Sequence, residues 1–69
     1  MSRLVELGKN IKKYRKLKKL SQNQLAEVLD FSREHVACIE TGKEYISLRK
    51  LFELADVLEV PVQKFFEFE

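Results

Sequence analysis

The stretch SQNQLAEVLDFSREHVACIETGK, residues 21–43, decides the fold of this chain. Its first part predicts a helix over about residues 22–29. Ser21 precedes that segment, and its hydroxyl can accept a hydrogen bond from a backbone N–H of the first helical turn. Gln24 follows three residues later, which completes the sequence pattern of a capping box. We therefore expect a helix that begins immediately after Ser21.

The second part of the stretch predicts another helix after a very short turn. Asp30 interrupts the first helix, because aspartate is a poor helix-interior residue and tolerates left-handed backbone angles. Ser32 is suited to cap a helix that ends near Glu40, and Gly42 is suited to its left-handed stop. Two short helices joined by only about three residues must cross steeply and share one apolar interior. The residues that supply this interior are Leu25, Ala26, Leu29, Phe31, Val36 and Ile39.

Further helices are expected on both sides of this stretch. From Arg3 to Lys18, apolar residues recur every three or four positions with lysines between them, which is typical of an amphipathic helix. Ser47 precedes a fourth helix, and Pro61 suits the first turn of a last short helix, PVQKFF, because its missing N–H would be unsatisfied there anyway. The predicted buried stripe of the first helix is Leu4, Leu7, Ile11, Tyr14 and Leu17. The apolar face of the fourth is Leu48, Leu51, Phe52, Leu54, Ala55 and Leu58. We predict an all-α fold of five helices.

Length and composition limit the class of protein. The chain has 69 residues, of which 45% are hydrophobic. This length predicts one small domain over residues 1–69. One cysteine cannot form an internal disulfide, and no segment approaches the roughly 18 to 20 apolar residues of a membrane span. The N-terminal segment has no apolar core typical of a signal peptide. We expect a cytoplasmic protein with no membrane partner.

The charge of the chain is unevenly distributed. The net charge is only +2, but residues 1–20 carry eight cations and one anion, a net charge of +7. Residues 21–69 carry five cations and ten anions, a net charge of −5. Such a basic block is either a solvated helix face or a surface for a polyanion such as nucleic acid.

The only histidine and the only cysteine lie close together in the third predicted helix, which follows Ser32 and ends near Glu40. His35, Cys38 and Glu34 could share one face of it, but a structural zinc needs four ligands and a catalytic one needs three plus water, and no second cluster exists to complete a site. Catalysis by Cys38 would need a base and a carboxylate in a cleft that excludes water, and five short helices offer little cleft. We expect no metal, no cofactor, no small-molecule ligand and no enzymatic activity. A role for Cys38 as a redox sensor stays open.

Several motifs together resemble the Cro/C1-type (Xre-like) helix-turn-helix family of phage repressors and bacterial regulators. They are LGKNIKKYR, the SQNQLA start of the second helix, IETGK after the third, and SLRKLFELADVLEVPVQKFF at the end. The resemblance covers about Leu7 to Phe66 and implies a five-helix, lambda-repressor-like domain that binds double-stranded DNA. The single-domain build is similar to restriction-modification controller proteins and to small phage repressors. Asp30 and Lys19 stand where relatives often carry glycine, at a modest conformational cost.

The resemblance implies that the third helix lies in the major groove of DNA. Arg33 can then make a bidentate contact to guanine, and Glu34 either accepts from a cytosine amino group or holds Arg33 in place. Cys38 offers at most an apolar contact to a thymine methyl group. The positions that correspond to base contacts are Arg33, Glu34, His35, Ala37 and Cys38. The positions that correspond to phosphate contacts are Ser21, Gln22, Thr41 and Lys43.

The family also implies an ion pair between Arg15 of the first helix and Glu40 at the end of the third. We assign this pair to structure, because loss of one partner of a buried pair strands a charge at a cost of about 3 to 5 kcal/mol.

Members of this family usually bind inverted repeats as homodimers. The ending VLEVPVQKFFEFE carries more apolar surface than so short a helix can bury, which favours a dimer contact there. Phe65 and Phe66 could instead close the core of the monomer, and Tyr45 or Ile46 could join the contact. The predicted interface is Val62, Phe65, Phe66 and Phe68. A different class of function also stays open, in which the same fold is a protein-interaction module of the antitoxin or anti-repressor type.

Overall fold

Four α-helices and one short 3₁₀ helix make up the secondary structure of residues 3–68, the part of the chain that the computed structural model describes. No strand occurs within these residues. In chain order the elements are α1 (Arg3–Leu17), α2 (Gln22–Leu29), α3 (Arg33–Thr41), α4 (Leu48–Leu58) and η1 (Val62–Phe66).

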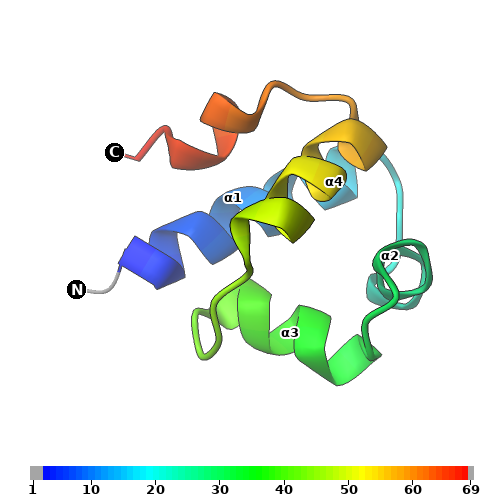
Figure 1. Ribbon diagram of the computed structural model, residues 1–69. Helices are drawn as coiled ribbons and strands as arrows, with labels where there is room; N and C mark the ends of the chain where they lie inside the picture. Colours follow the sequence, from blue (N-terminus) through cyan, green and yellow to red (C-terminus); the bar gives the residue numbers. More distant parts are fainter. Residues whose placement is uncertain (1–2, 69) are drawn as a thin grey trace.

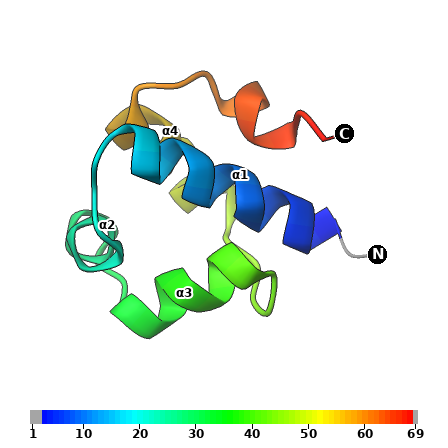
Figure 2. The ribbon, with the colours of Figure 1, turned by 180° about the vertical axis from the view of Figure 1, so that it is seen from behind.

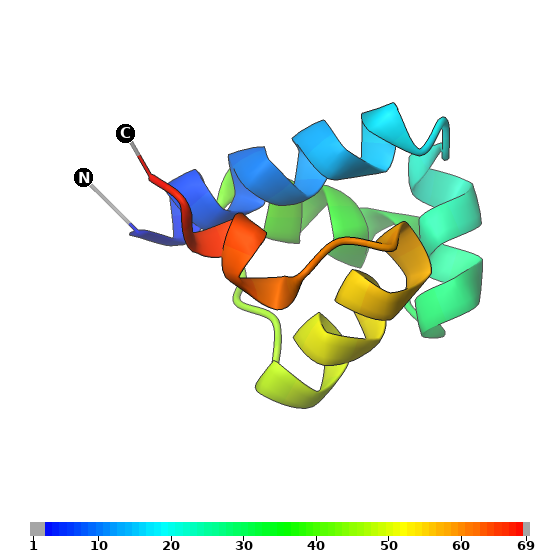
Figure 3. The ribbon, with the colours of Figure 1, turned by 90° about the horizontal axis from the view of Figure 1, so that it is seen from above.

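The helices surround one core, with α1 in the centre of the arrangement (Figure 1). In this view α3 lies below α1, α2 is seen nearly end-on beside α3, and η1 lies above. Seen from above, η1 runs beside α1, and the start of α1 and the end of η1 lie on the same side of the molecule (Figure 3). Because α2 and α3 are exposed on the side away from η1, the helix-turn-helix has one open face.

Local hydrogen bonds fix the ends of the helices where the sequence predicts them. The capping box of Ser21 and Gln24 is confirmed, since the Gln24 N–H donates to Ser21 Oγ at 3.0 Å and the Ser21 N–H donates to Gln24 Oε1 at 2.8 Å. Ser32 accepts from the His35 N–H at 3.0 Å in the same manner. Gly42 is left-handed, with φ of 82°, and the Lys43 N–H donates to the Cys38 carbonyl oxygen at 2.9 Å.

The residues that stand in place of turn glycines also adopt the left-handed region. Lys19 has φ of 64° and Asp30 has φ of 60°. Left-handed angles are costly for residues with a Cβ and least so for Asn and Asp. The short turn between α2 and α3 is therefore built without glycine, and the Phe31 N–H donates to the Ala26 carbonyl oxygen at 2.8 Å across it.

The core is formed by side chains from every element. Phe65 of η1 is completely buried, and its ring meets that of Tyr14 edge-on at 6.0 Å between centroids. The fully buried core consists of Ile11, Leu25, Ala26, Leu29, Val36, Ile39, Leu51, Leu54, Ala55, Leu58 and Phe65. The predicted dimer contact of Phe65 is therefore wrong, because a side chain with 0% exposure cannot reach a second subunit.

Two predictions about the helices also need correction. The last helix is a 3₁₀ helix that starts after Pro61, and the Lys64 N–H donates to the Pro61 carbonyl oxygen at 3.0 Å, three residues back. The predicted short last helix is therefore present as a 3₁₀ helix of five residues, and the structure has four α-helices in place of five. Leu17 is 67% exposed and is not part of the buried stripe. Arg15 occupies the last buried position of α1, and Leu17 lies two residues on, where the helix ends and side chains point outward.

No helix among residues 3–68 is both long and apolar enough to cross a membrane.

Candidate nucleic-acid interface

The open face of the molecule is formed by α3 and the start of α2. Arg33, Glu34 and Thr41 are exposed on α3, while Ala37 and Cys38 are half-buried. Val36 and Ile39 of the same helix are buried. The helix therefore divides into an apolar side packed on the core and a polar side that meets solvent.

Arg33 is held at the start of α3 by a residue of α2. Its Nη1 atom donates to Gln22 Oε1 at 3.2 Å, although both side chains retain access to solvent. The sequence leaves open that Glu34 holds Arg33, but the partner that the structure shows is Gln22. Glu34 lies in the first turn of α3, where the helix dipole favours a negative charge.

The other end of α3 is fastened to α1 by Arg15 and Glu40. Arg15 Nε donates to Glu40 Oε2 at 2.7 Å, and Nη2 donates to Oε1 at 3.1 Å. Arg15 is 6% exposed and Glu40 is 5% exposed. A third bond, from Arg15 Nη1 to the Leu20 carbonyl oxygen at 2.8 Å, uses the remaining arm of the guanidinium group. This bidentate geometry compensates for the burial of two charges.

Gln22 connects the buried pair to the open face. Its Nε2 atom donates to Glu40 Oε1 at 3.0 Å, while its Oε1 atom accepts from Arg33. A continuous path of hydrogen bonds thus runs from Arg15 through Glu40 and Gln22 to Arg33. The sequence predicts only a phosphate contact for Gln22, because the contact with Glu40 joins residues 18 positions apart and leaves no local pattern.

Close contact between the backbones of α1 and α3 was also missed. Gly8 is buried against the last turn of α3, and a Cβ there would lie 2.5 Å from the Glu40 carbonyl oxygen. Only glycine allows α1 to approach the carbonyl groups this closely. The sequence does contain a sign of this contact, namely a glycine inside a predicted helix. Glycine lowers helix stability, so its presence there usually has a packing reason.

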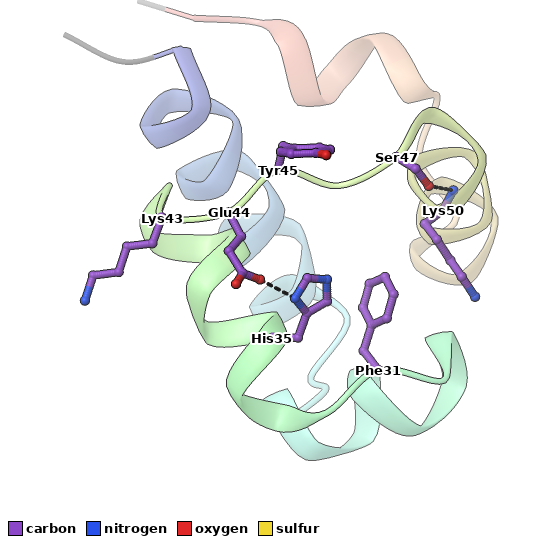
Figure 4. A pocket seen from close by; sticks show the side chains of 7 residues that line it. All are labelled: Phe31, His35, Lys43, Glu44, Tyr45, Ser47 and Lys50. Carbon is purple, nitrogen blue, oxygen red and sulfur yellow. Dashed lines mark hydrogen bonds and ion pairs between the residues drawn. The ribbon is translucent and has the colours of Figure 1, made fainter.

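His35 faces the loop after α3. It forms an ion pair with Glu44, and its ring meets Phe31 edge-on at 4.5 Å between centroids. Figure 4 shows these side chains in an open groove of about 480 Å³ between α3 and α4, with Lys43 directed away from it. Two of the predicted base contacts are therefore already bound to other parts of the chain, Arg33 to Gln22 and His35 to Glu44.

Cys38 and Thr41 lie farther along the open side of α3. Cys38 is a half-buried free thiol beside Ser32 and Glu34. The Thr41 hydroxyl donates to the Ala37 carbonyl oxygen at 3.0 Å, within its own helix. Among residues 3–68, no three His, Cys, Asp or Glu side chains are grouped so that they could hold a metal ion. This side of α3 offers one strong donor, Arg33, beside small or acidic side chains.

Comparison with known sequences agrees with this architecture. Residues 11–65 match the profile of the helix-turn-helix family HTH_3. Control protein C.SmaI of Serratia marcescens is 34% identical over 58 residues, which span 84% of this chain and 69% of that protein. The uncharacterized HTH-type transcriptional regulator MJ0272 of Methanocaldococcus jannaschii is 37% identical over 59 residues, spanning 86% of this chain and 89% of that protein.

Solved structures show the same fold. The restriction-modification controller protein C.AhdI of Aeromonas hydrophila superposes with a TM-score of 0.84 at 32% identity, over 91% of this chain and 96% of that one. The clp gene regulator ClgR of Corynebacterium glutamicum gives a TM-score of 0.90 at 21% identity, over 96% of this chain and 70% of that one, and supports the fold alone. Since the family profile covers most of its length, the protein belongs to the Cro/C1-type helix-turn-helix family of DNA-binding transcription regulators.

Proposed function

We propose that the protein binds a specific inverted repeat in double-stranded DNA as a homodimer and regulates transcription from that site. The observation that carries the proposal is the position of Arg33. It lies at the exposed start of α3, in the first turn after a tight turn from α2, and Gln22 holds its guanidinium group. In helix-turn-helix proteins the start of the second helix of the motif meets base edges in the major groove.

Arg33 supplies the main base contact in this proposal. Two of its N–H donors match the O6 and N7 acceptors of guanine, and such a bidentate contact is worth about 1 to 3 kcal/mol of discrimination. Glu34 accepts from a cytosine amino group, and the half-buried Ala37 and Cys38 offer apolar contact to thymine methyl groups. His35 contributes at the edge of this surface after its contact with Glu44 is broken or shared.

Phosphate contacts position the helix. Ser21 and Gln22 lie at the N-terminus of α2, where free backbone N–H groups and the helix dipole favour an anion. Thr41 and Lys43 lie at the opposite end of α3, both exposed. Phosphate contacts from the start of α2 and from the end of α3 together would fix the register of α3 on the duplex.

Exposed apolar side chains on α4 and η1 support a homodimer. Leu48 is 67% exposed, Phe52 is 52% exposed and Phe66 is 47% exposed. Lys50 donates to the Leu29 carbonyl oxygen of α2 at 2.7 Å, so Leu48 and Phe52 lie on the flank of α4 that faces away from α2. The proposed contact combines these residues with Val62 and Phe68, which are half-buried.

The names of two relatives support the regulatory context. C.SmaI is a control protein and C.AhdI is a restriction-modification controller protein, and both exceed 30% identity to this chain. We therefore propose a controller-type regulator.

The proposal is tested by selecting bound duplexes from a random pool, first with the wild-type protein and then with Arg33→Ala. The wild-type protein should enrich an inverted repeat with half-sites about one helical turn apart. Arg33→Ala should lose the preference for one guanine in each half-site and bind about 5- to 100-fold more weakly, which corresponds to about 1 to 3 kcal/mol. Lys18→Ala is the control, because it removes one positive charge from an exposed lysine that pairs with Glu59 and that belongs neither to α3 nor to the proposed dimer contact.

Three results would contradict the proposal in whole or in part. Enrichment of no motif by the wild-type protein would reject sequence-specific DNA binding and favour a protein-interaction module on the same fold. An unchanged motif with Arg33→Ala would remove Arg33 from the base contacts. A motif with a single half-site would reject the homodimer.

A further inference from the structure

A row of lysines on the outer side of α1 has no part in the proposed contact between α3 and DNA. Lys9, Lys12, Lys13 and Lys16 are all exposed. They recur every three or four residues and therefore lie along one side of the helix. These four residues are called the lysine flank below.

The lysine flank spans the outer side of α1, with Lys12 at its edge towards α3 and with Lys9 and Lys13 beside Glu67, which follows η1. Gly8 and Arg15 face α3, whereas Asn10 Nδ2 donates to the Phe65 carbonyl oxygen of η1 at 2.8 Å. Lys12 follows Gly8 by four residues and precedes Arg15 by three, so it neighbours the line that packs on α3. Figure 2 shows α1 between η1 and α3.

No lysine of the flank forms an ion pair within residues 3–68, although Glu6 and Glu67 line one hollow with Lys9 and Lys13. The ion pairs of the described residues join Arg15, Lys18, His35, Lys50 and Lys64 to acidic side chains, and none includes a residue of the flank. Lys13 lies over the Tyr14 ring at 5.2 Å. Like charges three or four residues apart destabilise a helix, so this arrangement favours a bound anion.

The chemistry of the lysine flank fits a nucleic-acid backbone better than a protein. Protein interfaces are depleted in lysine and enriched in aromatic residues, whereas contacts to DNA phosphates are made by lysine and arginine. Lys9 and Lys16 are seven residues apart, a rise of about 10 Å, and a duplex carries about six backbone charges over that length. The flank also continues through Lys19 towards Ser21 and Gln22, the proposed phosphate contacts.

We propose that the lysine flank is a second phosphate-binding surface, which holds duplex DNA just outside the half-site as it curves towards α1. The inference rests on the proposed function, because only α3 in the major groove brings DNA to this side of the molecule. Attraction between the lysines and the phosphates would offset the elastic cost of bending the flanking DNA.

The test compares how strongly the dissociation constant depends on salt for two duplexes that carry the selected operator. The short duplex ends at the edge of the inverted repeat, and the long one extends about 15 base pairs beyond each edge, or about one and a half helical turns. Dissociation constants are measured over a salt series for the wild-type chain, for Lys12→Gln/Lys16→Gln, and for Lys18→Gln/Lys64→Gln. The last variant loses the same charge from lysines that are not part of the flank and that pair with Glu59 and Glu67.

The wild-type chain should show a steeper slope of log K against log salt on the long duplex than on the short one. Lys12→Gln/Lys16→Gln removes two lysines from each of the two subunits, and each neutralised phosphate contributes about 0.9, so the long-duplex slope should fall by about 3.6. The short-duplex slope should stay unchanged. Lys18→Gln/Lys64→Gln should retain the wild-type difference between the duplexes. Unchanged affinity for the short duplex also shows that each variant is folded.

Equal wild-type slopes on the two duplexes would overturn the proposal, as would an unchanged long-duplex slope in Lys12→Gln/Lys16→Gln. If Lys12→Gln/Lys16→Gln reduced the slope equally on both duplexes, these lysines would lie within the half-site, and the proposal would also be overturned. If the lysine flank bound an acidic protein and not DNA, the lysine variant would have the same slopes as the wild-type chain on both duplexes. A wild-type chain without sequence preference on the short duplex rejects the proposed function, whereas retained preference with unchanged slopes rejects the flank alone.

Discussion

The inner and outer sides of α3 are stabilised in different ways. On the inner side, Glu40 is buried and accepts hydrogen bonds from Arg15 and Gln22. On the outer side, Arg33 has one hydrogen bond at 3.2 Å and His35 has an ion pair with the exposed Glu44. The inner bonds join three helices, whereas the outer ones involve side chains that still reach solvent.

This difference separates the residues that hold the fold from those proposed to read DNA. Buried, fully bonded charges are costly to disturb, while exposed pairs contribute little. Changes at Arg33, Glu34 or Cys38 should therefore alter the choice of operator with little effect on stability. Gln22 is the exception, because it contacts both sides.

The largest effect is expected from Arg15→Ala. It leaves the Glu40 carboxylate buried without its cationic partner, which should lower the free energy of unfolding by about 3 to 5 kcal/mol. Thermal and urea melts followed by circular dichroism measure the loss. Arg3→Ala removes an exposed arginine of the same helix and should change stability by less than about 0.5 kcal/mol.

An unchanged unfolding midpoint for Arg15→Ala would show that the buried pair of Arg15 and Glu40 does not stabilise the packing of α3. Replacing both partners, as Arg15→Met/Glu40→Leu, should recover much of the stability, because no charge is then left buried alone.

A smaller loss is expected from Gly8→Ala. The new methyl group would lie 2.5 Å from the Glu40 carbonyl oxygen, so α1 and α3 must move apart. Alanine favours the helix by about 1 kcal/mol, but overpacking typically costs about 1 to 3 kcal/mol or more, and the net effect should be destabilising. Denaturant melts measure it, with the exposed Lys9→Ala as the control. A more stable Gly8→Ala protein would mean that the two backbones are not in close contact.

The elements that could be predicted from the sequence are those determined by nearby residues. Ser21 and Ser32 cap helices through bonds to backbone groups three residues away, and Gly42 ends α3 through its own backbone angle. Such short-range chemistry leaves a readable pattern. The family resemblance supplied the partner of Arg15, which no local pattern gives.

The features that were missed depend on how distant segments meet. Gln22 and Glu40 touch only because α1, α2 and α3 converge, and Glu44 reaches His35 only after the loop turns back. For Phe65 the sequence leaves open a dimer contact or a place in the core, because composition shows an excess of apolar residues without showing which of them is buried. Burial of a single side chain is a property of the whole packing, so it cannot be deduced from a short segment.

On the outer side of α3, Glu44→Gln should have only a small effect. The side chains of His35 and Glu44 are 34% and 51% exposed, and pairs of this kind contribute about 0 to 1 kcal/mol. A double-mutant cycle of His35→Ala and Glu44→Gln, measured by denaturant melts, gives the coupling energy. A coupling above about 2 kcal/mol would erase the contrast between the two sides of α3.

The smallest effect is expected from an exposed pair far from α3, that of Lys18 and Glu59. The hydrogen bond and the positive charge of Lys18 lower the pKa of Glu59 from its usual value of 4.5. A lowered pKa in the folded state means that the pair stabilises the protein above that usual value and loses its effect as the pH falls through the folded-state pKa. Stability of the wild-type protein and of Lys18→Gln should therefore differ slightly near neutral pH and converge in acid, which denaturant melts at several pH values measure.

Added salt should shrink the same difference at neutral pH, because exposed charges are screened. A difference that persists in acid or survives high salt would mean that Lys18 acts through packing of its aliphatic chain.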